Sequence, residues 1–242
     1  MLSVDNLHAG YGDAEVLFGI DLQVEKGEVV AIVGSNGAGK TTLLRALSGI
    51  IQPTQGHVRL LGEDVTGMHT HNLVEKGLVM VPEGRRLFPR MSVRRNLEIA
   101  AYSSRARPHL AEQLREVYEL FPILQERSDQ LGGTLSGGQQ QMVAIARGLV
   151  ATPEVLMLDE VSLGLAPVMI SRVYEAIRAI RDTGVTLVLV EQNVSQALSV
   201  ADRAYVIQHG QVALSGSGKE LQDNEEVRRV YLGLGPKEEK LK

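Results

Sequence analysis

The chain has 242 residues, of which 25 are Lys or Arg and 29 are Asp or Glu, so its formal net charge is −4. A mildly acidic chain without a basic cluster is a poor nucleic-acid binder, and the absence of cysteine excludes disulfides, thiolate metal sites and a cysteine nucleophile. No apolar run approaches the roughly 20 residues of a membrane-spanning helix, so we predict a folded domain that does not cross a membrane.

The first third of the chain predicts two kinds of strand. Leu2–Leu7 and Val16–Val24 alternate apolar and polar residues, as strands of a partly exposed antiparallel sheet do. Val29–Val33 is a continuous apolar run, which is typical of a strand buried on both faces. Lys40–Leu47 predicts a helix. Further strands are predicted at His57–Leu61 and Leu78–Val81.

The remaining chain begins with a helical stretch and then returns to buried strands. From about residue 92 to residue 150 the pattern is almost wholly helical. Buried strands are predicted at Val155–Leu158 and Val185–Val190, with an amphipathic helix at Pro167–Arg181 between them. A hairpin-like pair of strands is predicted at Ala204–Gln208 and Gln211–Leu214. The end of the chain, Pro236–Lys242, is charged and is predicted to fray.

This order of elements predicts an α/β fold with a mostly parallel core sheet, a small antiparallel sheet at the start and a helical insertion in the middle. No linker rich in Pro or Gly sets the insertion apart, so we expect a subdomain packed on the core. A single domain is predicted over residues 1–235, with the core at 1–85 and 151–235, the helical subdomain at about 86–150, and a charged tail at 236–242.

A glycine-rich loop follows the first buried strand and precedes the first helix. Its sequence, GSNGAGKT over residues 34–41, matches the phosphate-loop pattern G-x-x-x-x-G-K-[ST]. Backbone N–H groups of such a loop surround phosphate oxygens, Lys40 reaches the β- and γ-phosphates, and the Thr41 hydroxyl ligates Mg²⁺. The residues expected to bind nucleotide here are Gly34, Ser35, Asn36, Gly37, Ala38, Gly39, Lys40, Thr41 and Thr42.

Two acids follow a later buried strand. Asp159 and Glu160 come directly after the apolar run Val155–Leu158. Because ligands of open α/β sheets bind beyond the carboxyl ends of the strands, this position lies beside the phosphates. Asp159 is therefore expected to hold Mg²⁺ through water, and Glu160 to activate the attacking water as a general base.

A second anion-binding device precedes a predicted helix. In LSGGQ, at residues 135–139, a serine and two glycines expose backbone N–H groups at a helix N-terminus. With LSGGQQQMVAIARGL lying before VLMLDE, the chain resembles the ABC ATPases, which have a P-loop NTPase (RecA-like) core. The resemblance implies a head-to-tail dimer in which this signature closes over ATP held by the other subunit. The signature residues expected at that nucleotide are Ser136, Gly137, Gly138 and Gln139.

Four short sequence segments resemble a narrower group, the second ATPase subunit of Liv-type importers of branched-chain amino acids. They are VPEGRRLFPRMSV, SLGLAP, VEQN and NEEVRRVYLG. The resemblance implies ATP hydrolysis with Mg²⁺, a second ATPase subunit, two membrane permeases and, indirectly, a periplasmic binding protein. It also implies a peripheral location at the cytoplasmic face of the inner membrane. Tyr11 falls where the family stacks an aromatic ring on adenine.

Four positions depart from the pattern of most ABC ATPases. Glu83 replaces a glutamine that contacts Mg²⁺ and the attacking water, and Gln192 replaces a histidine that bonds the γ-phosphate. We expect Glu83 to act as a metal ligand and, with Gln192, in catalysis. Ala166 replaces an aspartate that links the subunits, and Val161 replaces a proline.

Several alternatives stay open on the sequence alone. Gln192 and Ala166 together are consistent with an ATP-dependent dimerisation switch that hydrolyses weakly. Importers of urea and short amides have similar ATPases, so the transported solute is implied only by resemblance. The dimer partner is either a different ATPase subunit or a second copy of this chain.

Overall fold

The computed structural model describes residues 1–231, and the predicted tail at 236–242 lies outside them. The N-terminal sheet is antiparallel and has the strand order β2-β1-β4-β5. Its strands are β1 (Leu2–Tyr11), β2 (Ala14–Val24), β4 (Gln55–Leu60) and β5 (Glu63–Asp64). The buried residues of β1 are Leu2, Val4, Leu7 and Ala9, which alternate with more exposed ones on either side of a register shift at residues 5–6, and this confirms the alternation that predicted the sheet. The short strand β5 was not predicted.

The second sheet has six strands in the order β10-β9-β3-β8-β7-β6. They are β3 (Val29–Val33), β6 (Leu78–Val81), β7 (Val155–Asp159), β8 (Thr186–Glu191), β9 (Arg203–Gln208) and β10 (Gln211–Ser217). The strands from β9 to β6 pair in parallel, and β10 alone is antiparallel, at one edge. Every residue of β3, β7 and β8 is buried, as a parallel sheet covered on both faces requires. The predicted α/β class is confirmed.

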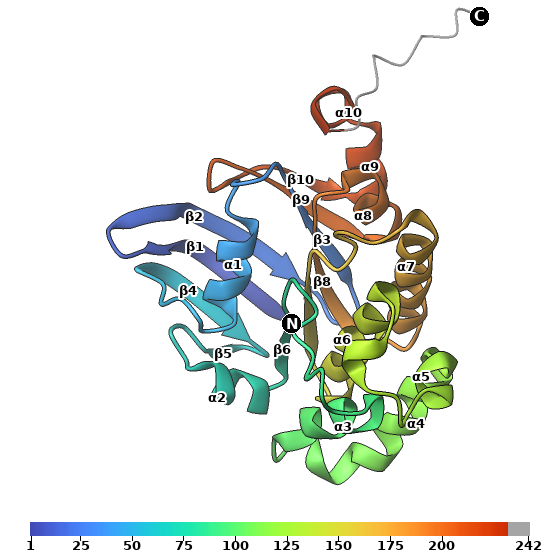
Figure 1. Cartoon of the computed structure of the whole chain (residues 1–242). Coiled ribbons are helices and arrows are strands. Elements are labelled where there is room, and N and C mark those ends of the chain that lie inside the picture. The colour runs from blue at the N-terminus through green and yellow to red at the C-terminus, as the bar shows by residue number, and fades with distance from the viewer. Residues whose placement is uncertain (232–242) are drawn as a thin grey trace, which may run out of the picture.

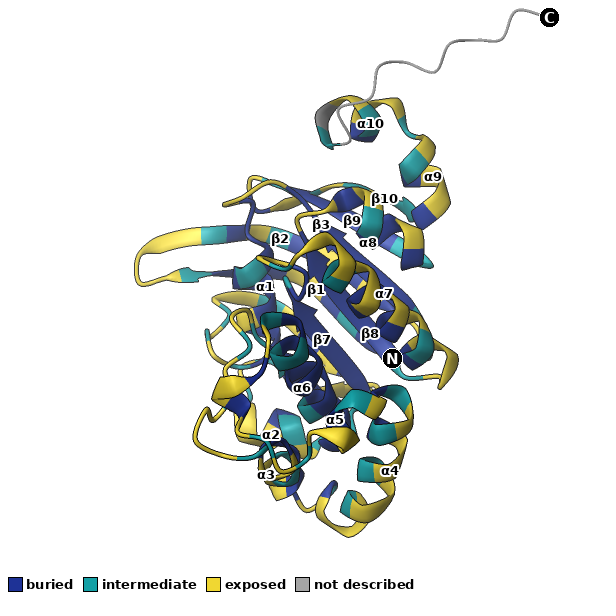
Figure 2. Cartoon of the chain, turned by 45° about the vertical axis from the view of Figure 1, so that its right-hand side comes forward, coloured by how far each residue is buried: buried dark blue, intermediate teal, exposed yellow. Residues whose placement is uncertain are grey.

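Helices cover both faces of this sheet (Figure 1). They include α1 (Lys40–Leu47), α6 (Gly137–Val150), α7 (Pro167–Asp182) and α8 (Val194–Val200). Side chains of β3 alternate between two cores. Val30 and Ile32 pack with α1 and the antiparallel sheet, whereas Val29, Ala31 and Val33 pack with α6, α7 and α8. Figure 2 shows the buried strands of this sheet, the largely buried helix α6 and the exposed outer side of α7. The helix α8 was not predicted.

The segment between β6 and β7 contains no strand, as predicted. It holds α3 (Val93–Glu98), α4 (Leu110–Leu120), α5 (Pro122–Glu126) and α6, with 3-10 turns at Ile99–Tyr102, Arg107–His109 and Gly132–Thr134. Figure 1 shows α3, α4 and α5 gathered at one end of the molecule. Helix α6 packs against β6 and β7 as well as α3 and α4. Because α6 serves both parts, the boundaries of the helical subdomain stay a prediction.

Three further helices complete the described chain: α2 (Thr70–Glu75), α9 (Gly218–Asp223) and α10 (Glu225–Tyr231). None of them was predicted. In Figure 1, α9 and α10 lie at the opposite end from α3–α5. Within residues 1–231, no helix combines the length and the apolar character that crossing a membrane requires.

Gly210 joins the two sheets beside the phosphate loop. Its carbonyl oxygen accepts a hydrogen bond from Phe18 N–H in β2, and its N–H donates to Ala38 O, both at 2.9 Å. Gly210 has a φ of 75°, and a Cβ added to it would lie 1.9 Å from Val16 O. Only glycine fits this close approach, so the turn after β9 fixes the antiparallel sheet against the loop.

Candidate nucleotide site

The phosphate loop connects the carboxyl end of β3 to the N-terminus of α1. Its turn uses left-handed glycines, and Gly39, with a φ of 110°, is the N-cap of α1. The Lys40 side chain points back into the loop, where Nζ donates hydrogen bonds to Gly34 O at 3.0 Å and Ser35 O at 3.1 Å. The loop thus surrounds an ammonium group that is only 4% exposed. Ser35, Asn36 and Gly37 form its exposed rim.

The two predicted acids lie at the carboxyl end of β7, next to this lysine. Glu160 Oε1 is 3.6 Å from Lys40 Nζ, and its side chain is 11% exposed. Asp159 is 1% exposed, and its Oδ1 has no hydrogen-bond partner among the described residues. Burial, helped by the negative charges of Glu160 and Glu83, raises the pKa of Asp159 to about 6. A buried carboxylate oxygen without a partner fits a cation or the water bound to one.

Glu160 has an unusual backbone conformation. Its φ is 45°, in the left-handed region that residues with a Cβ rarely adopt. Its N–H donates to Val190 O at 2.9 Å, so the turn after β7 is fixed to the neighbouring strand β8. Such strain persists only where surrounding contacts enforce it.

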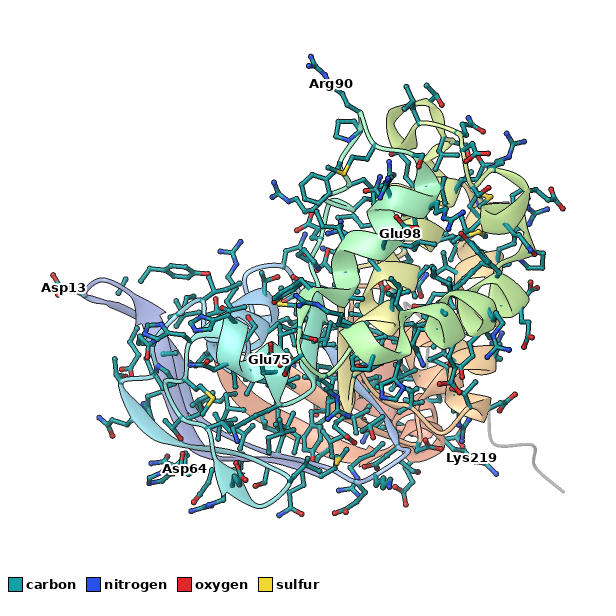
Figure 3. The ribbon with its side chains drawn as sticks, turned by 90° about the horizontal axis from the view of Figure 1, so that it is seen from below. Asp13, Asp64, Glu75, Arg90, Glu98 and Lys219 are labelled. Carbon is teal, nitrogen blue, oxygen red and sulfur yellow. The ribbon has the colours of Figure 1, made fainter. Side chains whose placement is uncertain are left out.

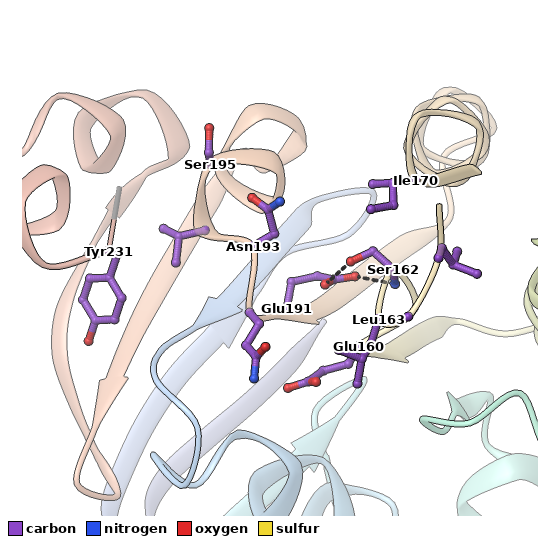
Figure 4. Close-up of a pocket in the computed structure, with 12 residues that line it drawn as sticks. Glu160, Ser162, Leu163, Ile170, Glu191, Asn193, Ser195 and Tyr231 are labelled. Atoms are coloured by element: carbon purple, nitrogen blue, oxygen red, sulfur yellow. Dashed lines mark hydrogen bonds between the residues drawn. The ribbon is translucent and has the colours of Figure 1, made fainter. Parts of the chain in front are cut away.

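An additional buried acid, which the sequence did not single out, lies at the end of β8. Glu191 is 1% exposed and accepts hydrogen bonds from Ser162 N–H at 3.1 Å and from Ser162 Oγ at 2.7 Å. Burial raises the pKa of Glu191 to about 7, against the opposing effect of the Ser162 hydrogen bonds. The dashed lines in Figure 4 mark this pair, which joins the loop after β7 to the loop after β8.

Gln192 follows Glu191 and is exposed. It lines a cavity of about 670 Å³ together with Glu160, Ser162, Glu191 and Asn193. Figure 4 shows this cavity from the side of α8. The structure therefore brings Gln192 and Glu160 to one cavity, at the carboxyl ends of adjacent parallel strands.

The predicted adenine contact lies at the end of β1. The Tyr11 hydroxyl accepts hydrogen bonds from Arg45 Nη1 at 3.0 Å and from Thr42 Oγ1 at 3.4 Å, both on α1. Its ring is 45% exposed. Tyr11 thus lies beside the helix that begins at the phosphate loop, on the antiparallel sheet that Gly210 fixes there.

The predicted signature lies at the start of α6. Ser136 is its N-cap and forms a capping box, in which Ser136 N–H donates to Gln139 Oε1 at 3.0 Å and Gln139 N–H donates to Ser136 Oγ at 3.4 Å. Gly137 is half-buried and Gly138 is buried. Within residues 1–231, no hydrogen bond or ion pair joins the signature to the phosphate loop. One chain therefore does not bring the two anion-binding devices together.

Glu83 is exposed and lies at the start of the loop that leaves β6. Two residues on, the Arg85 guanidinium donates to Gln140 Oε1 at 3.2 Å and lies against Gly137, where an added Cβ would be 3.1 Å away. Arg85 and Arg86 both have left-handed φ angles, 66° and 46°. The loop after Glu83 is thus attached to the helix that begins with the signature.

The sequence and the fold of the chain are similar to those of known proteins. The family described as ABC transporter matches residues 17–162. The high-affinity branched-chain amino acid transport ATP-binding protein BraG of Pseudomonas aeruginosa is 45% identical over 96% of the chain and 100% of its own length. The lipopolysaccharide export system ATP-binding protein LptB of Haemophilus influenzae is 34% identical over 96% and 97%. A crystal structure of the ADP conformation of an ATP-binding cassette of an ABC transporter superposes with a TM-score of 0.82 at 26% identity, covering 96% and 98% of the two chains.

Proposed function

Since the chain belongs to the ABC transporter family and is one of its ATPases, we propose that it energises the uptake of branched-chain amino acids through separate membrane permeases. The observation that carries hydrolysis is the convergence of Lys40, Asp159 and Glu160 at the ends of two parallel strands. The solute is supported by the 45% identity with BraG over 96% of this chain and all of BraG, compared with 34% for LptB.

The nucleotide binds with its phosphates in the loop at residues 34–41 and its adenine beside Tyr11. Backbone N–H groups of the loop and the N-terminus of α1 would bind the phosphate oxygens, and the Lys40 ammonium, which lies within the loop, would contact them as well. Thr42 contributes indirectly, because its hydroxyl donates to the Tyr11 hydroxyl.

Thr41, Asp159 and Glu83 would hold Mg²⁺. The support is the unpartnered Oδ1 of Asp159, which lies buried at the end of β7, and the nearby charge of Glu83, which acts on Asp159. Bound there, the ion would neutralise charge on the β- and γ-phosphates.

Glu160 accepts a proton from the attacking water as that water's oxygen bonds to the γ-phosphorus and the bond to the β–γ bridging oxygen breaks. Gln192 donates a hydrogen bond to the γ-phosphate, for which its amide suffices without a proton to transfer. Glu83 orients the same water. The assignments of Glu160 and Gln192 are supported by their shared cavity, and that of Glu83 by the effect of its charge on Asp159.

The complete site is proposed to form between two ATPase subunits arranged head to tail. Ser136, Gly137, Gly138 and Gln139 of one subunit bind the γ-phosphate held by the other, using the N-terminus of the 14-residue helix α6. The partner is a different ATPase subunit or a second copy of this chain.

Two permeases are proposed to contact a groove of about 410 Å³ between β6, α2 and the helical segment. Its apolar side chains Ile50, Phe88, Ile99 and Tyr102 are exposed at 59%, 42%, 42% and 53%. Arg147 lies over the Phe88 ring, 5.2 Å from its centroid, so one wall carries a positive charge. Figure 3 shows Arg90 projecting beyond this end of the molecule. We propose that the chain lies at the cytoplasmic face of the inner membrane, with a periplasmic binding protein on the far side.

The proposal is tested by reconstituting the chain with its permeases and partner ATPase in proteoliposomes. We expect ATP-dependent uptake of radiolabelled leucine, and about 10³-fold slower phosphate release for Glu160→Gln. Uptake of urea in place of leucine would assign the chain to a urea or amide importer. Phosphate release that stays negligible with all partners present would favour the dimerisation switch, and full turnover by Glu160→Gln would refute Glu160 as the base.

A further inference from the structure

We propose that Glu191 is a positioning residue that holds Glu160 in its left-handed backbone conformation and fixes its distance from Gln192. The inference rests on the proposed hydrolysis at Glu160. Glu191 lines the same cavity as Glu160 and Gln192, but its carboxylate is hydrogen-bonded to Ser162 (Figure 4).

Hydrogen bonds to β8 hold the chain on both sides of Glu160. On one side, Glu160 N–H donates to Val190 O at 2.9 Å. On the other, Ser162 N–H and Ser162 Oγ both donate to the Glu191 carboxylate. Because Val190 and Glu191 are consecutive in β8, one rigid strand sets the positions of residues 160 and 162. The turn between them has little freedom to relax.

A side-chain carboxylate is well suited to this role. Ser162 presents two donors, an N–H and an O–H, and a carboxylate offers two separate acceptor oxygens. The bonds are 3.1 and 2.7 Å long, and both partners are buried, Glu191 at 1% and Ser162 at 7% exposure. A buried acid is costly for stability unless it is hydrogen-bonded. Its presence next to the catalytic turn points to a role in aligning that turn.

The same residue determines where Gln192 lies. Gln192 follows Glu191 directly, and the carboxylate anchors the last residue of β8 to the loop that carries Glu160. Glu160 and Gln192 line one cavity. In the proposed mechanism Glu160 acts on the water that attacks the γ-phosphorus, and Gln192 donates a hydrogen bond to the same γ-phosphate. A shift of about 1 Å between the two side chains should therefore slow hydrolysis about 100-fold.

Four variants test the inference. Glu191→Met keeps the volume and removes both acceptors. Glu191→Gln keeps one acceptor, and its amide N–H can donate to Ser162 Oγ. Ser162→Ala removes the O–H donor alone. The control is Thr186→Val at the other end of β8, where Thr186 is 1% exposed and its Oγ1 accepts from Gly27 N–H at 3.0 Å.

We expect Glu191→Met to lower kcat about 100-fold while the Kd for ATP changes less than about threefold. The kcat of Ser162→Ala should lie between those of Glu191→Met and Glu191→Gln, and the kcat of Glu191→Gln should stay within about fivefold of the wild-type value. Thr186→Val should lower Tm without lowering kcat, which separates alignment from stability. In the Glu160→Gln background, Glu191→Met should cause no further loss, because it acts through Glu160.

A folded Glu191→Met protein with wild-type kcat would overturn the inference, as would equal loss of kcat in Thr186→Val. If Glu191→Met fails to fold, the kcat values of Ser162→Ala and Glu191→Gln test the inference instead, because Ser162→Ala loses only one hydrogen bond and should fold. Full activity of Ser162→Ala would then refute the proposal. Failure of the proposed function is distinguishable, since Glu160→Gln would then retain wild-type turnover.

Discussion

The site concentrates negative charge on residues that the fold buries. Asp159 and Glu191 are each 1% exposed, and burial raises the pKa of both carboxyls, to about 6 and about 7. A raised pKa means that the carboxyl ionises less readily in the folded than in the unfolded chain. Ionising each of these two carboxyls therefore lowers the stability of the fold. The stability of the chain alone, measured by urea denaturation, should therefore rise as the pH falls from about 7 toward about 4.5, between the folded and unfolded pKa values of these two groups.

Neutralising Asp159 should stabilise the chain while removing a proposed Mg²⁺ ligand. A shift from 3.8 to about 6 corresponds to about 3 kcal/mol at neutral pH, and imperfect packing of the amide would reduce the gain. We expect Asp159→Asn to raise the free energy of unfolding by about 1–3 kcal/mol, as measured by urea denaturation without nucleotide. The added stability that MgATP gives the wild type should disappear.

The control for this prediction is the same substitution at Asp13. That residue is exposed at the tip of the β1–β2 hairpin, where Figure 3 shows it projecting into solvent. Asp13→Asn should change the unfolding free energy by less than about 0.5 kcal/mol. If Asp159→Asn proves no more stable than Asp13→Asn, the buried charge at Asp159 is not a source of instability.

At the scale of elements, the helix after the catalytic turn begins without a side-chain cap. The N-cap of α7 is Ala166, with extended φ and ψ angles of −65° and 149°. Helices α6 and α9 begin at Ser136 and Ser217, and both of these have complete capping boxes. The first N–H groups of α7 therefore have no side-chain acceptor at the cap.

Ala166→Ser should stabilise the chain by about 1 kcal/mol, because its hydroxyl can accept from the first turn of α7. Thermal denaturation of the chain alone measures the gain as a higher Tm. The control is Ala179→Ser inside the same helix, half-buried, where serine lowers helix propensity and should lower Tm slightly. Equal effects of the two substitutions would contradict the capping argument.

Elements were predictable where the information was local. The alternation in β1 and the continuous apolar run of β3 reflect how each strand is buried, so both strands were correctly predicted. The short helices α8, α9 and α10 have six or seven residues each, too few for a helical period to stand out. For α9, the pattern Ser217-x-x-Glu220 is typical of a capping box and could have predicted the start of the helix.

The same distinction applies to the site. The phosphate loop is one contiguous motif, and its lysine could be assigned from the sequence. The pair of Ser162 and Glu191 is separated by 29 residues, and only the pairing of β7 with β8 brings it together. Likewise, Arg85 reaches Gln140 over 55 residues, through the packing of the loop after β6 on α6. No local sequence pattern predicts either contact.

At the scale of the whole molecule, one glycine connects the antiparallel sheet, which carries Tyr11, to the core sheet, which carries the phosphate loop. Gly210 accepts from Phe18 N–H and donates to Ala38 O, so β2, the turn after β9 and the phosphate loop meet at a single residue. The relative position of Tyr11 and the loop therefore depends on this joint.

Gly210→Ala should be severely destabilising. An added Cβ would lie 1.9 Å from Val16 O, and the φ of 75° is unfavourable for alanine. We expect a loss of about 4 kcal/mol or more in urea denaturation. The control is Gly62→Ala, with a φ of 84° and no atom within 4 Å of the added Cβ, which should cost about 1–2 kcal/mol. A loss at Gly210 no larger than that at Gly62 would show that the two sheets are not held together there.

The apolar groove beside Phe88 has a consequence for how such a subunit is made in the cell. Ile50, Ile99 and Tyr102 leave about half of their surface in contact with water in the isolated chain. Chaperones and proteases recognise exposed surface of this kind. Copies of this chain made in excess over the permeases would keep this surface exposed and would be prone to aggregation and degradation. Protein quality control, as well as gene expression, would therefore keep the subunits of the assembly in balance.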